Sequence, residues 1–212
     1  MYGGFIMKTS KFGRQLVLWM ALGDGTLNAN GYLSIRHSDK QKEYLQWKHD
    51  ILKENGISVT DLYFVNNNGY GAWEFRTKSY SFIKQYRKLL YRPSKQIGND
   101  KILKKIQPFG IFIWYLDDGS LTKYKERGKV VGNNLMINTY TSKEENQIII
   151  DWFFNNFNIS FGQNKDKGRY RLRCGTKQAR IFLSVIEKYK HLVPSMAYKF
   201  DVKPNSLQGS SN

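Results

Sequence analysis

The chain carries one pattern twice: VLWMALGDG at Val17–Gly25 and IFIWYLDDG at Ile111–Gly119. Each copy is a run of apolar residues closed by an acid and a glycine, followed by a small hydroxyl residue. An apolar run without a polar face is typical of a helix that is buried on all sides, and the glycine is typical of a helix C-terminal stop. The pattern therefore predicts two buried helices that each end at an acid, Asp24 and Asp118.

These two acids are placed where a nearby cation is needed. The C-terminal end of a helix already carries about half a negative charge, so a carboxylate there is unfavourable. If the two helices pack side by side and point the same way, their negative ends and both carboxylates converge. Mg²⁺ binds carboxylate and carbonyl oxygens and keeps positions for water and phosphate. A single helix followed by Asp-Gly is usually a capped turn, but two matched copies favour a metal site between two halves.

The charge of the chain indicates a polyanionic partner. There are 34 Lys and Arg residues against 17 Asp and Glu residues, which gives a net charge of +17 and a pI of about 9.8. Such a surplus favours a partner with many phosphates, although ribosomal proteins and membrane-surface binders share it. An aromatic content of 15% and a hydrophobic content of 41% argue against a basic disordered tail. We therefore expect a folded body to carry the charge.

Cysteine content and hydropathy restrict the compartment. Cys174 is the only cysteine, which excludes an intrachain disulfide and a Cys-rich zinc site and favours a reducing, intracellular location. The composition does not distinguish an organelle, a phage-infected cell and the bacterial cytoplasm. No apolar run approaches the roughly 18 residues of a membrane span. Residues 1–10 lack the apolar core of a signal peptide, and residues 204–212 are expected to be disordered.

The repeat extends beyond the two helices. Each copy is followed by a strand of alternating polarity, a helix with a start signal, a hairpin and a second helix. In the first half these are the strand 31–37, the helix 40–55 after Ser38 and Gln41, the hairpin 61–65 with 72–76, and the helix 79–90. In the second half they are the strand 133–139, the helix 146–157 after Thr141 and Glu144, the hairpin 160–164 with 169–173, and the helix 178–190. The same order occurring twice indicates one duplicated domain.

With both motifs and their matched flanks in view, the chain resembles the LAGLIDADG homing endonucleases in their single-chain, two-repeat form. A third match is the segment 192–199, which resembles the closing segment of the family. The resemblance implies an α+β fold built from a pseudo-twofold duplicated αββαββα repeat. Its two antiparallel sheets would form a DNA-binding saddle around a central two-helix interface. The expected boundaries are 1–97 for the N-terminal repeat and 98–203 for the C-terminal repeat.

The resemblance also implies the activity and its residues. A member of this form acts as a monomer on double-stranded DNA, which it cleaves at a long target site, promoting mobility of an intron or intein. Asp24 and Asp118 would be the catalytic, metal-binding carboxylates. Lys199, and less directly Lys95, would organise the attacking water or stabilise the transition state. The carbonyls of the residues before the acids would also bind metal: Gly23 and Asp117. The implied cofactor is Mg²⁺, with Mn²⁺ substituting and Ca²⁺ supporting binding without cleavage.

Alternation along the strands predicts a DNA-binding face, since a two-stranded ribbon fits the major groove. Leu33 and Ile35 would pack inward, as would Trp73 and Phe75. The outward residues, which we expect to contact bases or phosphates, are Tyr32, Ser34, Arg36, Glu74, Arg76, Met136, Asn138, Tyr140, Arg169, Arg171 and Arg173. The last three place like charges on one strand face, which would repel one another unless something anionic lay against them.

Two other functions stay open at this point. Some relatives are maturases that bind host intron RNA and assist splicing, although a retained pair of acids argues against this as the sole function. A non-catalytic DNA-binding module on the same scaffold is expected to lose an acid, and both acids are present here. A histidine-metal nuclease of another type is not supported, because the three histidines show no ligand-like spacing: His37, His49 and His191.

Overall fold

The computed structural model describes residues 9–67, 69–92 and 94–201. The expectations for a signal peptide and for a disordered tail at 204–212 concern stretches that lie wholly or mostly outside these residues. Among the residues described, no helix has the length and apolar character needed to cross a bilayer. The chain divides into two compact units, Met1–Lys95 and Gln96–Asn212, called unit 1 and unit 2 below.

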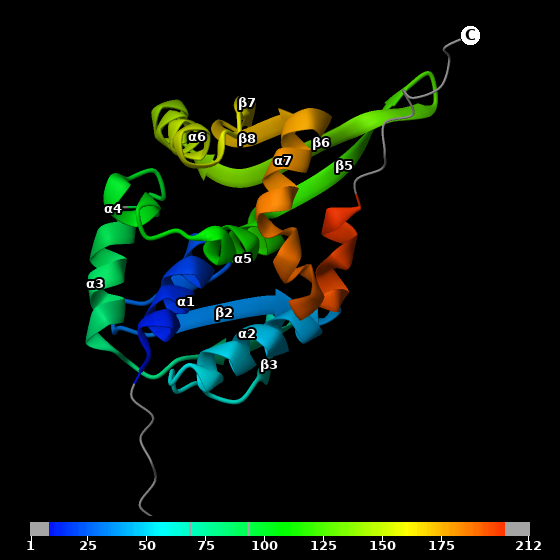
Figure 1. The fold of residues 1–212 in the computed structure, drawn as a ribbon. Coiled ribbons are helices and arrows are strands. Elements are labelled where there is room, and N and C mark those ends of the chain that lie inside the picture. Colours follow the sequence, from blue (N-terminus) through cyan, green and yellow to red (C-terminus); the bar gives the residue numbers. More distant parts are fainter. Residues whose placement is uncertain (1–8, 68, 93, 202–212) are drawn as a thin grey trace, which may run out of the picture. The chain divides into compact units, whose positions relative to one another are not determined.

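Unit 1 is built around one buried helix and one four-stranded antiparallel sheet (Figure 1). The strand order in the sheet is β1-β2-β4-β3. A 3-10 turn over Asp39–Gln41 precedes the second helix. The elements in chain order are α1 Lys11–Leu22, β1 Thr26–Leu27, β2 Leu33–Ser38, α2 Lys42–Glu54, β3 Tyr63–Asn67, β4 Tyr70–Arg76 and α3 Ser81–Leu90.

Unit 2 repeats this plan with one additional short helix and a longer hairpin (Figure 1). Its sheet has the equivalent order β5-β6-β8-β7. The elements are α4 Asp100–Leu103, α5 Pro108–Asp118, β5 Gly119–Glu126, β6 Lys129–Thr141, α6 Lys143–Phe157, β7 Gly162–Asp166, β8 Arg169–Gly175 and α7 Thr176–Ile186. Two 3-10 helices, η2 Glu187–Leu192 and η3 Pro194–Phe200, close the unit. Both units thus confirm the α+β class and the duplicated αββαββα repeat.

The two motif helices are buried as the sequence predicts. Residues 16–22 of α1 and 112–116 of α5 have no exposed surface. Ser10 begins α1 by accepting the backbone N–H of Gly13 at 2.8 Å, and a proline opens α5. Gly119 ends α5 as expected, but the stop of α1 is Gly23, two residues before the expected glycine. Asp24 therefore follows its helix directly, and Asp118 is the last residue of its own.

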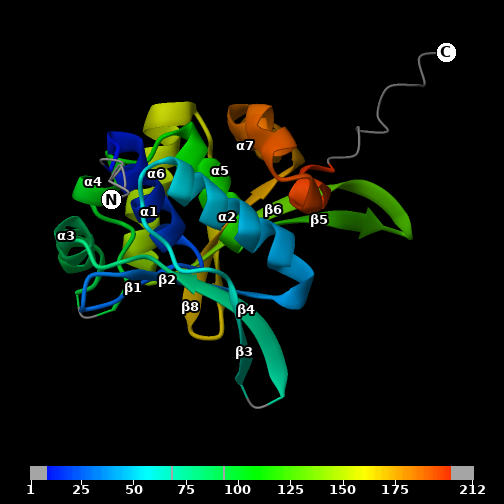
Figure 2. The same ribbon diagram turned by 90° about the horizontal axis from the view of Figure 1, so that it is seen from below.

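Each sheet presents one buried face and one accessible face. Along β2 the side chains alternate, with Leu33 and Ile35 fully buried and Arg36 exposed. In β6, Leu135 and Ile137 are buried in the same way. Helices α2 and α6 pack on the buried faces of their own sheets, and the hairpin β3–β4 extends beyond the helices of unit 1 (Figure 2). The inward and outward assignment of these strands is confirmed.

Two strands escape the sequence pattern. β1 has only two residues, and β5 reads GSLTKYKE, a largely polar segment that is mostly exposed. β5 pairs with β6 in a long hairpin whose turn contains Arg127 and Gly128, both with positive φ. A strand that buries few side chains shows no apolar alternation, so hydropathy does not reveal it.

Two expected helix-start signals are wrong. Ser38 makes no side-chain cap, and the 3-10 turn separates it from α2. In unit 2, Thr141 is still part of β6, and the cap of α6 is Ser142, whose hydroxyl accepts the backbone N–H of Glu145 at 3.1 Å. The capping spacing is therefore present in unit 2, one residue later than expected.

Candidate functional site

The half-site of unit 1 lies at the C-terminal end of α1. Gly23 caps this helix, and the Asp24 side chain that follows is 38% exposed. The Lys95 ammonium donates a hydrogen bond to the Gly23 carbonyl at 2.6 Å. Lys95 thus neutralises the negative end of the helix beside the acid, and the structure brings this lysine to a carbonyl 72 residues earlier in the sequence. The carbonyl that the resemblance assigns to a metal accepts a hydrogen bond from this lysine.

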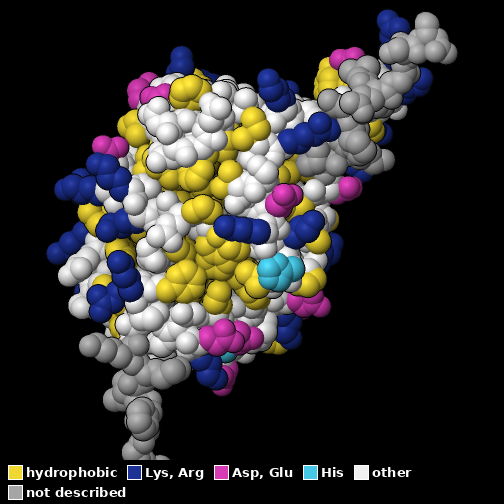
Figure 3. Space-filling view, in the orientation of Figure 1, with side chains coloured by type: hydrophobic (Ala, Val, Ile, Leu, Met, Phe, Trp, Pro, Cys, Tyr) yellow, Lys and Arg dark blue, Asp and Glu magenta, His cyan; other side chains and the backbone are white. Residues whose placement is uncertain are grey.

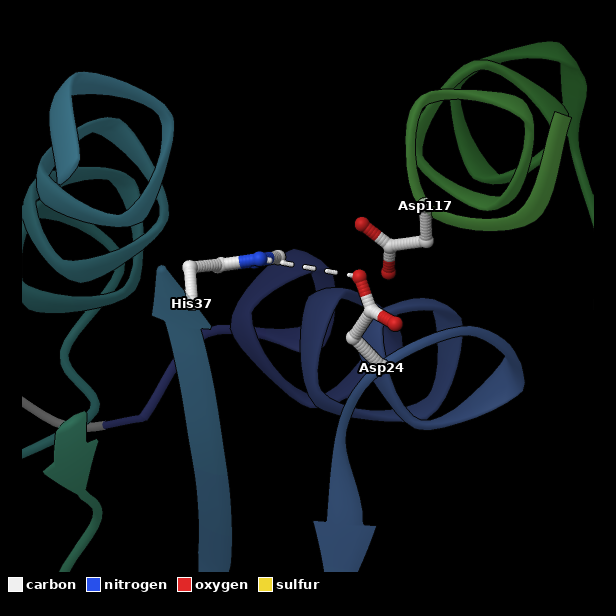
Figure 4. A group of neighbouring side chains, drawn as sticks. All are labelled: Asp24, His37 and Asp117. Carbon is white, nitrogen blue, oxygen red and sulfur yellow. Dashed lines mark ion pairs between the residues drawn. The ribbon is translucent and has the colours of Figure 1, made fainter. Parts of the chain in front are cut away.

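A buried histidine also reaches the acid. The Nδ1 atom of His37 lies 3.6 Å from a carboxylate oxygen of Asp24, as Figure 4 shows. On the other side of the ring, Nε2 lies 3.1 Å from the ammonium of Lys48, which is fully buried in α2. His37 was not among the residues expected at the site. Its inward position, two residues after Ile35 on β2, is the signal that could have located it.

The half-site of unit 2 lies at the C-terminal end of α5. The indole N–H of Trp114 donates to a carboxylate oxygen of Asp118 at 3.2 Å, one helical turn apart. This bond fixes the carboxylate against the last turn of the helix. The preceding acid, Asp117, projects from the same turn and is partly exposed (Figure 4).

Lys199 returns to the end of α5 from η3. Its ammonium donates to the carbonyls of Leu116 at 2.5 Å and Gly119 at 2.8 Å, and the residue is 7% exposed. The backbone carbonyl of Lys199 accepts the hydroxyl of Tyr115 at 2.6 Å. Burial raises the pKa of this tyrosine well above its usual range. Each unit therefore places one lysine at the carbonyl end of its motif helix.

The outer sheet face of unit 1 differs from its prediction at one residue. Glu74 lies on the predicted face, opposite Arg36 in the register of β2 and β4, but it is only 1% exposed. The guanidinium groups of Arg36 and Arg76 cover it, and both donate hydrogen bonds to its carboxylate. Glu74 is therefore not an accessible base-contacting residue. The cross-strand pairing of an acid with two arginines explains its burial.

The outer sheet face of unit 2 is irregular. The register of β6 and β8 shifts between Ile137 and Thr141, and Tyr140 within this bulge has φ 47° and is 42% exposed. Arg169 and Arg173 are exposed, whereas Arg171 is partly buried. The remaining predicted residues of the DNA face are accessible or partly accessible: Tyr32, Ser34, Met136 and Asn138.

An anion lies against one of the three β8 arginines within the protein. Asp166 of β7 forms an ion pair with Arg171 at 3.4 Å. The expected mutual repulsion on this strand is thus partly relieved inside unit 2. Figure 3 shows Lys and Arg side chains scattered around a central hydrophobic area on the face that it draws.

A pocket of about 340 Å³ connects the acid of unit 1 with the outer sheet face. Its lining residues follow α1 or lie on β1, β2 and β4 and in the loop between β1 and β2. Its lining is polar and aromatic: Asp24, Thr26, Asn28, Tyr32, Ser34, Arg36 and Glu74. A ligand on the sheet face therefore has direct access to the Asp24 carboxylate.

This geometry agrees with a known family. The model of the LAGLIDADG DNA endonuclease family matches residues 14–182, most of the chain. The chain belongs to this family. Probable intron-encoded endonuclease 1 of Wickerhamomyces canadensis is 25% identical to this LAGLIDADG chain over 200 residues, covering 90% of the chain and 84% of that protein. The RecA protein of Mycobacterium shimoidei is 32% identical over 114 residues, covering 51% of the chain and 26% of that protein.

The solved structures show the same fold. The homing endonuclease I-WcaI bound to its DNA recognition sequence superimposes on this LAGLIDADG chain with a TM-score of 0.74 at 21% identity, over 93% of the chain and 89% of I-WcaI. The chain spans only 26% to 45% of the length of the first mycobacterial RecA proteins that it matches. In those proteins the matched segment is part of a longer chain.

Proposed function

We propose that this LAGLIDADG chain is a site-specific DNA endonuclease that hydrolyses both strands of a long target site and thereby promotes mobility of an intron or intein. The observation that carries the proposal is the duplicated half-site. Asp24 follows α1, whose last carbonyls receive Lys95, and Asp118 ends α5, whose last carbonyls receive Lys199. Two half-sites match the two phosphodiester bonds of a duplex, so one chain suffices as a monomer.

The donor set of each half-site fits a divalent cation. The acids offer carboxylate oxygens and the helix ends offer carbonyl oxygens, which are the ligands preferred by Mg²⁺ and accepted by Mn²⁺. A cation bound by Asp24 or Asp118 would lower the pKa of an attacking water and stabilise the leaving oxygen. We expect Ca²⁺ to support DNA binding without cleavage.

The protein groups have separate roles in this reaction. Asp24 and Asp118 hold the negative charge that binds a cation, and each serves the phosphate nearest its own unit. Lys95 and Lys199 sit at the same helix ends, where an ammonium can orient the attacking water and stabilise charge on the phosphate in the transition state. The carbonyls of Gly23 and Asp117 are further candidate ligands. The Nδ1 atom of His37 lies 3.6 Å from the Asp24 carboxylate and 3.2 Å from Oε1 of Gln41.

Double-stranded DNA is the partner that the surface favours. The outward side chains of both sheets are rich in arginine and amide groups, which bind phosphates and base edges in the major groove. The net charge of +17 favours a polyanion over an uncharged substrate. The pocket beside Asp24 would allow DNA on the sheet of unit 1 to reach the acid.

The test is cleavage of a duplex library that contains uninterrupted gene sequences and a randomised segment, followed by sequencing of the ends. With Mg²⁺ we expect double-strand breaks at one enriched site, and with Ca²⁺ binding of the same site without breaks. Asp24→Asn and Asp118→Asn serve as variants that keep the side-chain shape. Breaks without any sequence preference would reject site specificity, and binding without breaks in Mg²⁺ would leave a DNA-binding module.

A further inference from the structure

A buried carboxylate organises the outer sheet face of unit 1. One oxygen of Glu74, Oε1, accepts the hydroxyl of Tyr63 at 2.6 Å, the Nε–H of Arg76 at 2.6 Å and the hydroxyl of Ser34 at 3.1 Å. The other oxygen, Oε2, accepts Nε–H of Arg36 at 2.9 Å and an Nη2–H of the same residue at 2.5 Å. Five donors from three strands thus converge on one carboxylate, which is 1% exposed.

The electrostatics of this cluster favour a charged Glu74. Burial raises the pKa of Glu74, but the hydrogen bonds from Tyr63, Arg36 and Arg76 outweigh it and lower the pKa from 4.5 to about 2. Burial, and then the hydrogen bond to Glu74, raise the pKa of Tyr63 to about 12. At neutral pH the cluster therefore holds two guanidinium charges around one carboxylate, with a net charge of +1.

The two arginines keep their outer ends available. Their side chains are 45% and 47% exposed, although their inner edges are fixed by the carboxylate. Arg76 donates to Glu74 through Nε–H, which leaves both Nη groups for other partners, and its Cζ atom lies 5.6 Å from the centroid of the Tyr32 ring. Arg36 uses Nε–H and one Nη2–H, which leaves the second Nη2–H and both N–H groups of Nη1. Within the described residues, neither guanidinium donates a further hydrogen bond.

Such a pair is suited to reading guanine. An arginine binds the O6 and N7 atoms of guanine through two parallel N–H groups, and this requires a fixed guanidinium plane. A long flexible side chain loses conformational freedom when it is ordered on DNA, whereas Arg36 and Arg76 are already ordered in the protein. Because they lie on adjacent strands, diagonal to one another, they reach neighbouring base positions.

We propose that Glu74 is a positioning residue that holds Arg36 and Arg76 as a preorganised pair of guanine readers, so that unit 1 selects guanine at two neighbouring positions of its half-site. This inference rests on the proposed function. It differs from a direct role of Glu74, in which the carboxylate would accept a hydrogen bond from the amino group of cytosine. Both oxygens of Glu74 already accept hydrogen bonds from five donors, so the carboxylate has no acceptor capacity left for that contact.

Base preference measured by binding tests the inference independently of cleavage. The probe is a duplex library with a randomised segment, selected by gel shift in Ca²⁺ and sequenced, for the wild type and for Glu74→Gln. We expect the wild type to enrich guanine at two neighbouring positions, and Glu74→Gln to reduce each preference about tenfold. Affinity for non-specific DNA should stay equal or rise, because the variant gains one positive charge.

Asp61→Asn is the matched control. Asp61 is exposed and lies just before β3, and its substitution changes the net charge by the same amount without touching the cluster. This variant should keep both guanine preferences. Tyr63→Phe removes one donor to Glu74 and leaves both arginines, so it should weaken the preferences by a few-fold.

Single-arginine variants keep the inference testable if Glu74→Gln does not fold. Arg36→Lys and Arg76→Lys preserve charge but lose the planar fork, so each should abolish one guanine preference and spare the other. A Glu74→Gln variant that folds and keeps both preferences overturns the inference, as does loss of a cytosine preference alone. A wild type that cleaves but enriches no sequence overturns the proposed site specificity and the inference with it.

Discussion

The outer sheet faces of the two units carry different side chains at matching positions. Glu74 in unit 1 and Arg171 in unit 2 each lie two residues before the arginine that ends the outward row, Arg76 in β4 and Arg173 in β8. In unit 1 the carboxylate satisfies five donors. In unit 2 the cation at this position forms only the longer pair with Asp166, at 3.4 Å.

This difference leaves the two faces unequal in their internal hydrogen bonding. In the described part of unit 2, three buried polar atoms near this position have no hydrogen-bond partner: Asn138 Oδ1, Asn164 Oδ1 and Arg171 Nε. The side chains at the matching positions of unit 1 take part in the hydrogen bonds around the Glu74 carboxylate. Buried polar groups without partners are costly, so they are sites where water or a ligand gains most by binding. One duplicated repeat has therefore produced one preorganised face and one adaptable face.

Removing the acid of either unit should have the largest effect on cleavage. Asp24→Asn and Asp118→Asn remove the charge that binds a cation, so each should lower double-strand cleavage by roughly 10²- to 10³-fold while DNA binding survives. If each acid serves one strand, each variant should nick a different strand slowly. Strand-specific end labelling in Mg²⁺, beside gel shifts in Ca²⁺, measures both effects. Near wild-type cleavage by both variants would place the active site elsewhere. Asp117→Asn should lower double-strand cleavage less than Asp24→Asn or Asp118→Asn.

The two lysines should differ in their contribution to stability. Lys199 is buried and donates to the carbonyls of Tyr115, Leu116 and Gly119, so Lys199→Met should lower the free energy of unfolding by roughly 2 to 4 kcal/mol. Lys95 is only partly buried and donates to the Gly23 carbonyl, so Lys95→Met should lower it by about 1 kcal/mol. Denaturant titration measures both values. Equal losses of unfolding free energy in the two variants would show that the burial and hydrogen bonds of Lys199 add no more stability than those of Lys95.

Glu74 should make the stability of unit 1 dependent on acid pH. Its pKa is lowered from 4.5 to about 2 in the folded state, so its stabilisation is fully present above about pH 4.5 and is lost as the pH falls toward 2. The difference in unfolding free energy between wild type and Glu74→Gln should therefore shrink over this interval, by on the order of 3 kcal/mol. Urea titrations at a series of pH values measure it. A difference independent of pH would contradict the assigned ion pairs.

The smallest effect is expected from exchanging a residue of the core. Lys48 and Ile149 are both fully buried. Lys48 lies four residues before Leu52, the last buried residue of α2, and Ile149 lies four residues before Phe153, the last buried residue of α6. Lys48→Ile loses the bond to His37 and the contact of the ammonium with the Tyr44 ring, 4.4 Å from its centroid, but no longer buries an ammonium, so the free energy of unfolding should change by about 1 kcal/mol or less. A loss of several kcal/mol, seen by thermal or denaturant unfolding, would mean that the lysine holds unit 1 together.

The apolar patterns predicted most of the fold. The two motif helices, strand β2 and both hairpins follow from alternation and helical spacing, because their side chains are divided between core and solvent. β5 was missed because its side chains are polar and exposed on both faces. The helix cap was wrongly placed at Thr141 because strand β6 continues through that residue. The local sequence does not show where the backbone hydrogen bonds of a strand end.

The acids and lysines of the candidate site were predictable because a sequence motif marks them. The hydrogen bonds around Glu74, where three strands meet, were not. Asp24, Asp118, Lys95 and Lys199 were selected from the repeat and the resemblance, and the structure places each lysine at the end of its motif helix. The burial of Glu74 depends on the register that brings Arg36 beside it, which alternation alone does not give.

The bond between Lys199 and the end of α5 has a consequence for the synthesis of the chain. The Gly119 carbonyl that accepts the lysine is made 80 residues before it. A ribosome-bound chain that ends anywhere in this interval carries both acids but lacks the cation at the second helix end. Over these 80 residues of synthesis the half-site of unit 2 therefore stays incomplete. If the proposed function holds, the half-site of unit 2 can act only after η3 has been synthesised.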